Sequence, residues 1–311
     1  MGLVRQALTR ARDPWVDAVL DVSLSLPEGR TFGLVGESGS GKTTLGRAVI
    51  GLVEPQEGQI RFRGEPAKHR SDRGLRPWRR QISMMFQDPV GSLSPRLTVR
   101  SLLLEPFRIH REPRRDLDRE AARLLEMVGL SADFAGRYPH ELSGGQARRV
   151  GVARALALNP LLIIADEPTA GLDVSVQGEI LNLMATLQRE IGLTYLLITH
   201  NLAVVRHVSD LLAIMYLGRF VETGPTETIF SRPAHPYTHG LLAAQPHPDP
   251  DRRRDKVELT GEVPSLRQRP SGCEFHTRCP FVQDRCRRER PEPRSLGAGR
   301  SVACHFPLAE R

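Results

Sequence analysis

The chain has 311 residues, of which 40% are hydrophobic and 26% charged, which is ordinary globular usage and excludes a disordered or fibrous chain. No apolar run approaches the roughly 18 residues needed to cross a bilayer, and the N-terminal stretch MGLVRQALTRARDPW lacks the apolar core of a secretory signal. Gln6 stands where a myristoylation motif has serine or threonine. We therefore expect a protein that is neither integral to a membrane nor exported.

The charge balance is basic, with 44 lysines and arginines against 36 acidic residues and a net charge of +8. Such an excess is typical of partners that carry phosphate, such as nucleic acid or anionic lipid. Basic residues crowd into residues 61–80, with shorter clusters at 252–254 and 285–290, and almost all are arginine. Two interpretations stay open, a solvated surface, which we favour, and a patch for phosphate or lipid headgroups.

The N-terminal residues open an α/β unit. Apolar and polar residues alternate over 19–26, and Pro27-Glu28-Gly29 follows, which predicts a hairpin of half-buried strands. Residues 31–35 form a short apolar strand that runs into a glycine-rich stretch, and a helical pattern then extends from Lys42 to Gly51. Strand, glycine-rich loop and helix in this order are typical of a P-loop protein.

The middle of the chain alternates between strand and helix patterns. Strands are predicted at 81–86, 161–165, 195–199 and 211–216. Residues from about 88 to 141 are mainly helical, and further helices are predicted from near Gln146, over 179–191 and from Leu202. This alternation predicts a mostly parallel sheet covered on both faces. After Phe230 periodicity fades and all four cysteines appear, which indicates a separate C-terminal extension.

The stretch GESGSGKT fits the phosphate-binding pattern G-x-x-x-x-G-K-[ST] between a strand and a helix. Its glycines let backbone N–H groups curl around phosphate oxygens, and the following helix N-terminus favours negative charge. Lys42 is expected to contact the β- and γ-phosphates and Thr43 to ligate Mg²⁺; the alternative, a glycine turn that binds nothing, is disfavoured by the context. The expected nucleotide contacts are Gly36, Glu37, Ser38, Gly39, Ser40, Gly41, Lys42, Thr43 and Thr44.

Two carboxylates follow the apolar strand at 161–165. Because ligands bind at the carboxyl ends of parallel strands, Asp166 suits the shell of a magnesium ion. Glu167 is then placed near the γ-phosphate, where it can polarise an attacking water.

Between these motifs lies Leu142-Ser143-Gly144-Gly145-Gln146, which is the signature of ABC-type ATPases. Gln87, Asp173 and His200 occupy the positions of that family's Q-loop, D-loop and switch histidine, so the resemblance covers roughly residues 17–220. Further runs resemble the ATP-binding subunits of bacterial oligopeptide/dipeptide importers and extend the match to the C-terminal cysteines: Tyr138-Pro139-His140, Leu172-Asp173-Val174-Ser175-Val176, Met215-Tyr216-Leu217-Gly218 and His235-Pro236-Tyr237-Thr238.

The resemblance implies an α/β fold with a P-loop NTPase core of the ABC type, in which a mostly parallel sheet is joined by an antiparallel β subdomain. It places a nucleotide-binding domain at residues 1–235, with a helical subdomain inserted at about 88–141. A small loop-rich extension at residues 236–311 would carry the four cysteines.

The resemblance also implies roles for individual residues. Glu167 and His200 are the expected catalytic pair, and Thr43, Gln87 and Asp166 the expected magnesium ligands. In the family, ATP lies between two subunits, so each chain supplies half of each site. The residues expected to face the partner's nucleotide are Ser143, Gly144, Gly145, Gln146 and Asp173.

Two positions depart from the family pattern. Ala170 stands in the D-loop where the family usually has serine, which removes a hydroxyl that could bond across the dimer. Trp15 is the one aromatic near the place where relatives stack a ring on adenine; a packing or surface role for it is the favoured interpretation.

The four cysteines, Cys273, Cys279, Cys286 and Cys304, are separated by five, six and seventeen residues. A disulfide pair is disfavoured in a chain without an export signal, and four soft thiolates suit an iron–sulfur cluster or zinc. The spacing is not that of common zinc motifs, so iron–sulfur, zinc and free thiols all stay open. The resemblance to importer subunits with a [4Fe–4S] cluster favours iron.

The resemblance predicts a subunit that hydrolyses ATP to power peptide uptake, peripheral on the cytoplasmic face of the inner membrane. Its expected partners are a second ATP-binding subunit, a paralogue in most relatives, two permease subunits and an extracytoplasmic peptide-binding protein. The cargo could instead be nickel, glutathione or another small solute. A soluble ABC ATPase acting on nucleic acid or the ribosome is the alternative from another class; with one P-loop and no heptad-bearing insertion, we expect no nucleic-acid partner.

Overall fold

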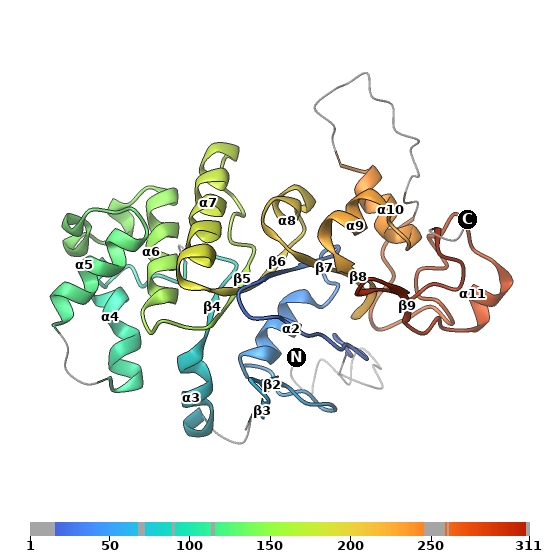
Figure 1. Cartoon of the computed structure of the whole chain (residues 1–311), viewed down its shortest axis with the longest axis horizontal. Coiled ribbons are helices and arrows are strands. Elements are labelled where there is room, and N and C mark those ends of the chain that lie inside the picture. The colour runs from blue at the N-terminus through green and yellow to red at the C-terminus, as the bar shows by residue number, and fades with distance from the viewer. Residues whose placement is uncertain are drawn as a thin grey trace, which may run out of the picture.

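The computed structural model describes residues 16–67, 72–88, 91–112, 116–245, 259 and 261–308. Figure 1 shows an elongated molecule with a helical group at one end, a sheet across the middle and the C-terminal residues at the other end. The helical group is formed by α4 (Val99–His110), α5 (Leu117–Met127), the short 3₁₀ helices η1 (Ala132–Gly136) and η2 (Pro139–Glu141), and α6 (Gly144–Leu156). None of the helices in the described ranges is long and apolar enough to span a membrane.

One eight-stranded sheet organises the chain. Its first five strands are parallel, which confirms the mostly parallel sheet, and its last three are antiparallel additions at one edge. In spatial order the strands are β4 (Ile82–Met85), β5 (Leu162–Asp166), β6 (Thr194–Thr199), β1 (Thr31–Val35), β7 (Leu211–Tyr216), β8 (Arg219–Pro225), β10 (Arg300–Val302) and β9 (Arg294–Gly297).

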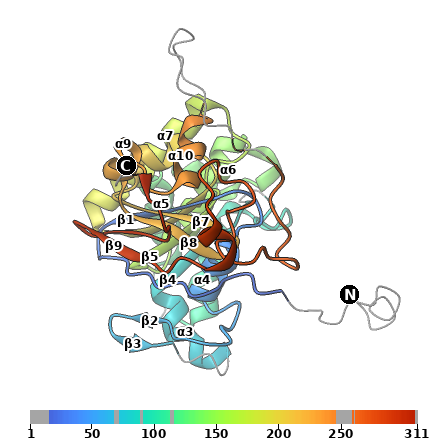
Figure 2. The same ribbon diagram turned by 90° about the vertical axis from the view of Figure 1, so that its right-hand side faces the viewer.

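The central strands are buried on both faces because helices cover each side. Along β5, Ile163 and Ala165 pack into one core with the helical group, α7 (Val174–Ile191) and α8 (Leu202–Val208). Ile164 points into a second core that includes Trp78 of α3 (Asp72–Gln81). Figures 1 and 2 show α3 and the hairpin of β2 (Arg61–Phe62) and β3 (Glu65–Pro66) on the side of the sheet away from α7, which makes a three-layered core.

The predicted strands at 19–26 are not formed. Residues Val19, Val22, Leu24 and Leu26 pack against the second core, so the alternation reports their burial correctly. The backbone makes no ladder, however: Asp21 adopts a left-handed conformation with φ of +49°, and Leu20 N–H donates to Gly218 O at 2.8 Å. An extended strand cannot continue through such a residue.

The C-terminal residues extend the sheet that the core begins. Strand β10 pairs antiparallel with β8, with Val302 opposite Glu222, and β9 pairs with β10. Three short helices accompany them, α9 (Thr226–Ser231), α10 (Pro236–Ala243) and α11 (Asp284–Arg288). The boundary at 235/236 stays a prediction, and the hydrogen-bonded sheet crosses it.

Candidate functional site

The loop between β1 and α2 (Lys42–Val49) has the backbone form that its glycines permit. Gly39 and Gly41 adopt positive φ of +79° and +102°, and Gly41 caps the start of α2. A Cβ at Gly36 would lie 2.2 Å from the carbonyl oxygen of Met215, so a larger residue cannot fit there. The loop therefore has the glycine-permitted backbone and the following helix start that let N–H groups bind phosphate.

Lys42 is buried within this loop. Its Nζ donates to Gly36 O at 2.8 Å, to Glu37 O at 2.9 Å and to Ser40 Oγ at 3.2 Å. Burial lowers the pKa of Lys42, while the nearby carboxylates of Glu167 and Asp166 act in the opposite direction. The ammonium group is thus held beside the loop backbone, where a phosphate oxygen would compete for its hydrogen bonds.

Thr43 and Asp166 meet across the site. Thr43 Oγ1 donates to Asp166 Oδ1 at 3.2 Å, and burial raises the pKa of Asp166 above its ordinary value. A hydroxyl and a carboxylate side by side are the hard oxygen donors that Mg²⁺ prefers. Gln87 is exposed, and among the described residues no hydrogen bond brings it to either group, so two of the three predicted magnesium ligands are assembled.

Glu167 and His200 come together at the ends of β5 and β6. His200 Nδ1 lies 2.6 Å from Glu167 Oε1, and the backbone N–H of His200 donates to the same oxygen at 3.1 Å. Thr199 Oγ1 donates to Glu167 Oε2 at 3.2 Å. The backbone of Glu167 is left-handed, with φ of +49°, which turns its side chain away from Asp166 and toward His200.

The signature residues form a separate group. Ser143 caps α6 by a reciprocal pair of bonds with Gln146: its Oγ accepts from Gln146 N–H, and Gln146 Oε1 accepts from Ser143 N–H. Asp173 caps α7 by a single bond, accepting from Val176 N–H at 3.0 Å. Within the part of the chain that the structure covers, no hydrogen bond joins this group to the P-loop. Ser143, Gly144 and Asp173 are exposed.

Sequence analysis missed Arg148, which lies one turn into α6 and is buried. Its guanidinium donates to the carbonyl oxygens of Glu167, Pro168 and Ala170, so it braces the backbone on both sides of the carboxylate that the sequence predicts to be catalytic. Burial lowers the pKa of Arg148. An arginine at a position surrounded by buried Ala147 and Val150 is the one local signal that could have pointed to it.

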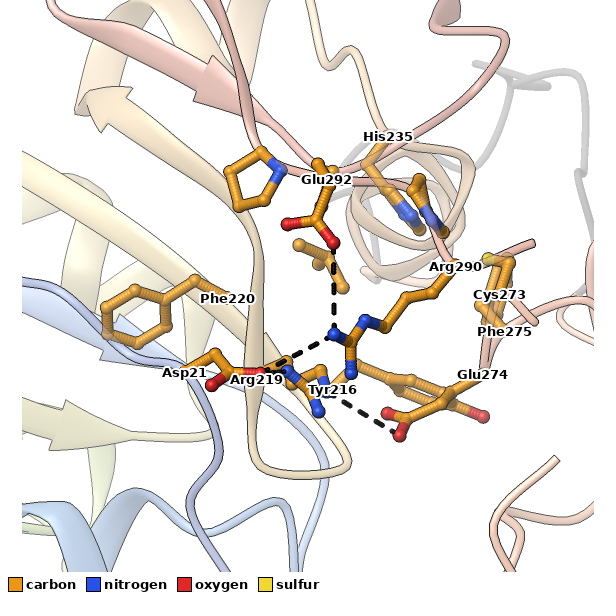
Figure 3. Close-up of a pocket in the computed structure, with 14 residues that line it drawn as sticks. Asp21, Tyr216, Arg219, Phe220, His235, Cys273, Glu274, Phe275, Arg290 and Glu292 are labelled. Carbon is orange, nitrogen blue, oxygen red and sulfur yellow. Dashed lines mark hydrogen bonds and ion pairs between the residues drawn. The ribbon is translucent and has the colours of Figure 1, made fainter. Parts of the chain in front are cut away.

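A hollow lies at the seam between the core and the C-terminal residues, with a volume of about 180 Å³ (Figure 3). Figure 3 shows Arg290 between Glu292 and Asp21, at 3.8 and 3.7 Å, and Arg219 beside Glu274 at 3.7 Å. Arg219 also pairs with Asp21. None of the residues that line this hollow belongs to the P-loop. The ion pairs around the hollow join the core to the C-terminal residues.

None of the four cysteines forms a disulfide, and all four line one pocket together with His276 and His305. Burial raises the pKa of Cys273 to about 12 and that of Cys304 to about 11. Across the described ranges, no group of three or more His, Cys, Asp and Glu side chains is arranged to hold a metal ion. Trp15 lies outside the described residues, and the backbone of Ala170 is engaged by Arg148.

Two family profiles match this sequence. The family described as ABC transporter covers residues 19–170, and the oligopeptide/dipeptide transporter C-terminal region covers residues 221–286. The "Probable peptide ABC transporter ATP-binding protein y4tS" of Sinorhizobium fredii is 50% identical over 94% of this chain and 83% of its own length. The oligopeptide transport ATP-binding protein AppF of Bacillus subtilis is 47% identical over 97% and 93%.

Solved structures agree with this placement. A dimeric ATP-binding cassette, MJ0796, in a post-hydrolysis state bound to ADP and Pi, is 31% identical, with a TM-score of 0.61 over 67% of this chain and 90% of its own. The cbiO1 protein of Clostridium perfringens, part of an ABC transporter complex, is 28% identical, with a TM-score of 0.63 over 69% and 84%. The chain is therefore an ABC ATPase, and it belongs to the ATP-binding proteins of ABC transporters that carry the oligopeptide/dipeptide C-terminal region.

Proposed function

We propose that this ATPase energises the import of peptides. The observation that carries the proposal is the extent of the match: relatives named for peptide or oligopeptide transport align over 94% and 97% of the chain, including the C-terminal region. A match confined to the catalytic core would support only the hydrolysis of ATP.

Within this proposal the P-loop holds the triphosphate. Lys42 exchanges its loop partners for β- and γ-phosphate oxygens, and the backbone N–H groups of residues 36–44 take the remaining oxygens. Thr43 and Asp166, already in contact, would hold Mg²⁺, and Gln87 would join them from its loop. The metal ion would neutralise charge on the β- and γ-phosphates.

Glu167 is the proposed general base. It accepts a proton from the water that attacks the γ-phosphorus, the bond to the β–γ bridging oxygen breaks, and ADP and phosphate form. His200 lies against Glu167 and is 69% exposed at its side chain, which leaves it free to reach the γ-phosphate. Thr199 orients the second oxygen of the carboxylate.

The separate signature group points to a second subunit. Ser143, Gly144 and Asp173 are exposed, and the neighbouring Val174 is 85% exposed. We infer that this group, together with Gly145 and Gln146, faces the nucleotide held by a second ATP-binding subunit, a paralogue of this chain.

A groove suits contact with a permease. It has a volume of about 280 Å³ and lies between β4, α3 and α4. Exposed Phe86, Ile109 and Leu52 line it together with several arginines. We propose that a segment of one of two permease subunits docks there, which would place the protein peripherally on the cytoplasmic face of the inner membrane, with an extracytoplasmic peptide-binding protein on the other side.

Reconstitution tests the proposal. The chain is purified with its permeases and partner ATPase in liposomes, and phosphate release is measured with the loaded binding protein. Peptide is expected to raise the rate several-fold, and Glu167→Gln serves as the inactive control. Stimulation by nickel or glutathione instead would reassign the cargo, and salt-sensitive nucleic-acid binding without permease association would overturn the transport assignment.

We further propose that Cys273, Cys279, Cys286 and Cys304 hold a [4Fe–4S] cluster. The support is their convergence on one pocket and the softness of four thiolates. Anaerobic purification followed by iron and sulfide analysis tests this, with about four irons per chain expected. A colourless protein with one zinc would favour the zinc alternative, and one with neither metal would leave free thiols.

A further inference from the structure

The C-terminal residues contact the P-loop through an ion pair whose arginine is buried. Arg278, next to Cys279, donates from Nη1 to Glu37 Oε2 at 2.7 Å and from Nη2 to Glu37 Oε1 at 3.0 Å. Arg278 is 6% exposed, and the hydrogen bonds to Glu37 raise its pKa. A bidentate pair between planar groups fixes orientation as well as distance. Glu37 is the first residue after Gly36, at the entrance of the phosphate loop.

The same P-loop residue is also held through its backbone. The N–H of Glu37 donates to the hydroxyl of Tyr237 at 3.1 Å, and Tyr237 is fully buried in α10. Glu37 is thus fixed at its side chain and at its main chain by two residues that lie beyond the core motifs.

The segment that carries Arg278 is itself anchored to the core (Figure 3). The ring of Phe275 lies 5.4 Å from those of Tyr216 and Tyr237, and Figure 3 shows Tyr216, Phe275 and Cys273 among the residues around the seam hollow. Tyr216 ends β7, and two residues later Gly218 N–H donates to Ser40 O in the P-loop at 2.9 Å. The cysteine segment, the end of β7 and the P-loop therefore form one packed unit.

Glu37 needs such a partner for an electrostatic reason. Its carboxylate is close enough to Lys42 to favour the charged ammonium, so it lies within reach of phosphate charge as well. An unpaired carboxylate there would repel a triphosphate. Arg278 neutralises it and prevents the side chain from turning into the loop.

We propose that Arg278 is a positioning residue of the ATP site: by holding Glu37 it keeps the P-loop in its phosphate-accepting form, so that nucleotide affinity depends on the segment from Cys273 to Cys279. The inference rests on the use of the P-loop for ATP. Because coupling between two sites is reciprocal, bound nucleotide must in turn stabilise that segment.

Titration of the full-length chain with ATP tests whether nucleotide affinity depends on Arg278. Arg278→Gln is expected to raise the Kd for ATP about tenfold, with kcat changed less than KM. The matched control is Arg285→Gln, which breaks an exposed pair with Glu289 in the same region and is expected to change Kd less than twofold. Glu37→Gln combined with Arg278→Gln should bind more tightly than Arg278→Gln alone, because no unpaired carboxylate remains.

Amide hydrogen exchange of the unmodified chain tests whether bound nucleotide stabilises the segment from Cys273 to Cys279. This measurement does not depend on any variant. Nucleotide is expected to slow exchange over residues 273–279 and not over 294–302. If Arg278→Gln does not fold, Arg278→Lys, which keeps the charge but loses the fork, should raise Kd about threefold. Equal ATP affinity in the Arg278 and Arg285 variants, or exchange unchanged by nucleotide, overturns the inference; failure of the unmodified chain to bind ATP would overturn the assignment of the P-loop instead.

Discussion

At the scale of single residues, two adjacent carboxylates have different environments. Asp166 ends β5 and meets Thr43, whereas Glu167, one residue later, meets His200 and Thr199. The left-handed backbone of Glu167 separates them, because an extended residue there would continue the strand. One carboxylate is thereby available to a cation and the other to a water, although they are neighbours in the chain.

Asp166→Asn is expected to stabilise the free protein. Burial raises the pKa of Asp166 above its ordinary value, so the favourable contribution of the protonated form is complete below the unfolded pKa and is lost as pH rises through the folded pKa. At pH 7 the charge therefore destabilises the folded protein, and its removal should raise Tm.

Thermal unfolding at pH 7 measures the Tm of the free protein, and its repetition with ATP and Mg²⁺ measures the increase in Tm on nucleotide binding. The variant should lose the increase in Tm that MgATP produces in the unmodified protein. Asp118→Asn is the control, because Asp118 is 80% exposed and its removal should leave both values unchanged. A lower Tm for Asp166→Asn would contradict the assignment.

Glu167→Gln separates binding from chemistry. The amide keeps the shape of the side chain but cannot accept the proton, so ATP binding should persist while kcat falls about 10²–10⁴-fold and the closed dimer accumulates.

Lys42→Ala should show the opposite pattern, with weakened nucleotide binding, because three loop bonds and one positive charge are lost. Phosphate release and nucleotide titration distinguish the two, and normal hydrolysis by Glu167→Gln would exclude it as the base.

At the scale of helices and strands, polar caps decide where the functional helices begin. Apolar periodicity places a helix over 179–191, but α7 begins at Val174, directly after the Asp173 cap. The helix predicted near Gln146 begins at Gly144, after the Ser143 cap. In both cases the residues before the periodic stretch are exposed or half-buried and lie outside the apolar period, and the side chain that accepts the first N–H groups sets the boundary.

Ser143→Ala separates the cap from the proposed partner contact. Loss of the cap should destabilise the protein by about 1 kcal/mol, and Thr98→Ala, which removes the cap of α4 from Ser101 N–H, should cost the same. Hydrolysis in the assembled complex should fall strongly only for Ser143→Ala. Equal hydrolysis by the two variants, measured at matched folded fractions, would remove the signature serine from the site.

Much of the core could be predicted from regular sequence patterns. Contacts between residues far apart in the chain could not. The strands at 31–35 and 211–216 agree with β1 and β7, because central parallel strands are continuous apolar runs. Apolar and polar residues alternate equally well over 19–26, and the apolar side chains are buried, but these residues do not pair as strands. Strands β9 and β10 are only a few residues long, and Arg148 and Arg278 act on residues far along the chain, so neither leaves a local pattern.

At the scale of the whole molecule, the sheet joins the catalytic core to the C-terminal residues. The joint is closed by a buried ion pair: Arg300 on β10 bonds to Glu222 on β8 at 2.7 Å, and Glu222 also accepts from the N–H groups of Ala234 and His235. Both ionic side chains are almost inaccessible to water. The C-terminal residues are thus a structural part of the core.

Arg300→Met should destabilise the whole molecule. It leaves the Glu222 carboxylate buried without its cation, which typically costs about 3–5 kcal/mol. The control is Arg285→Met, whose exposed pair with Glu289 should contribute less than about 1 kcal/mol. Urea unfolding provides the comparison; similar midpoints for the two variants would show that the β8–β10 joint contributes little to stability.

The brace formed by Arg148 has a consequence for the assembled pair of subunits. The residues proposed to meet the neighbour's nucleotide lie at the start of α6. One turn further along the helix, the guanidinium of Arg148 holds the carbonyl groups around Glu167. If a partner subunit covers that face, we expect the contact to act on the backbone of Glu167 through this one turn of helix.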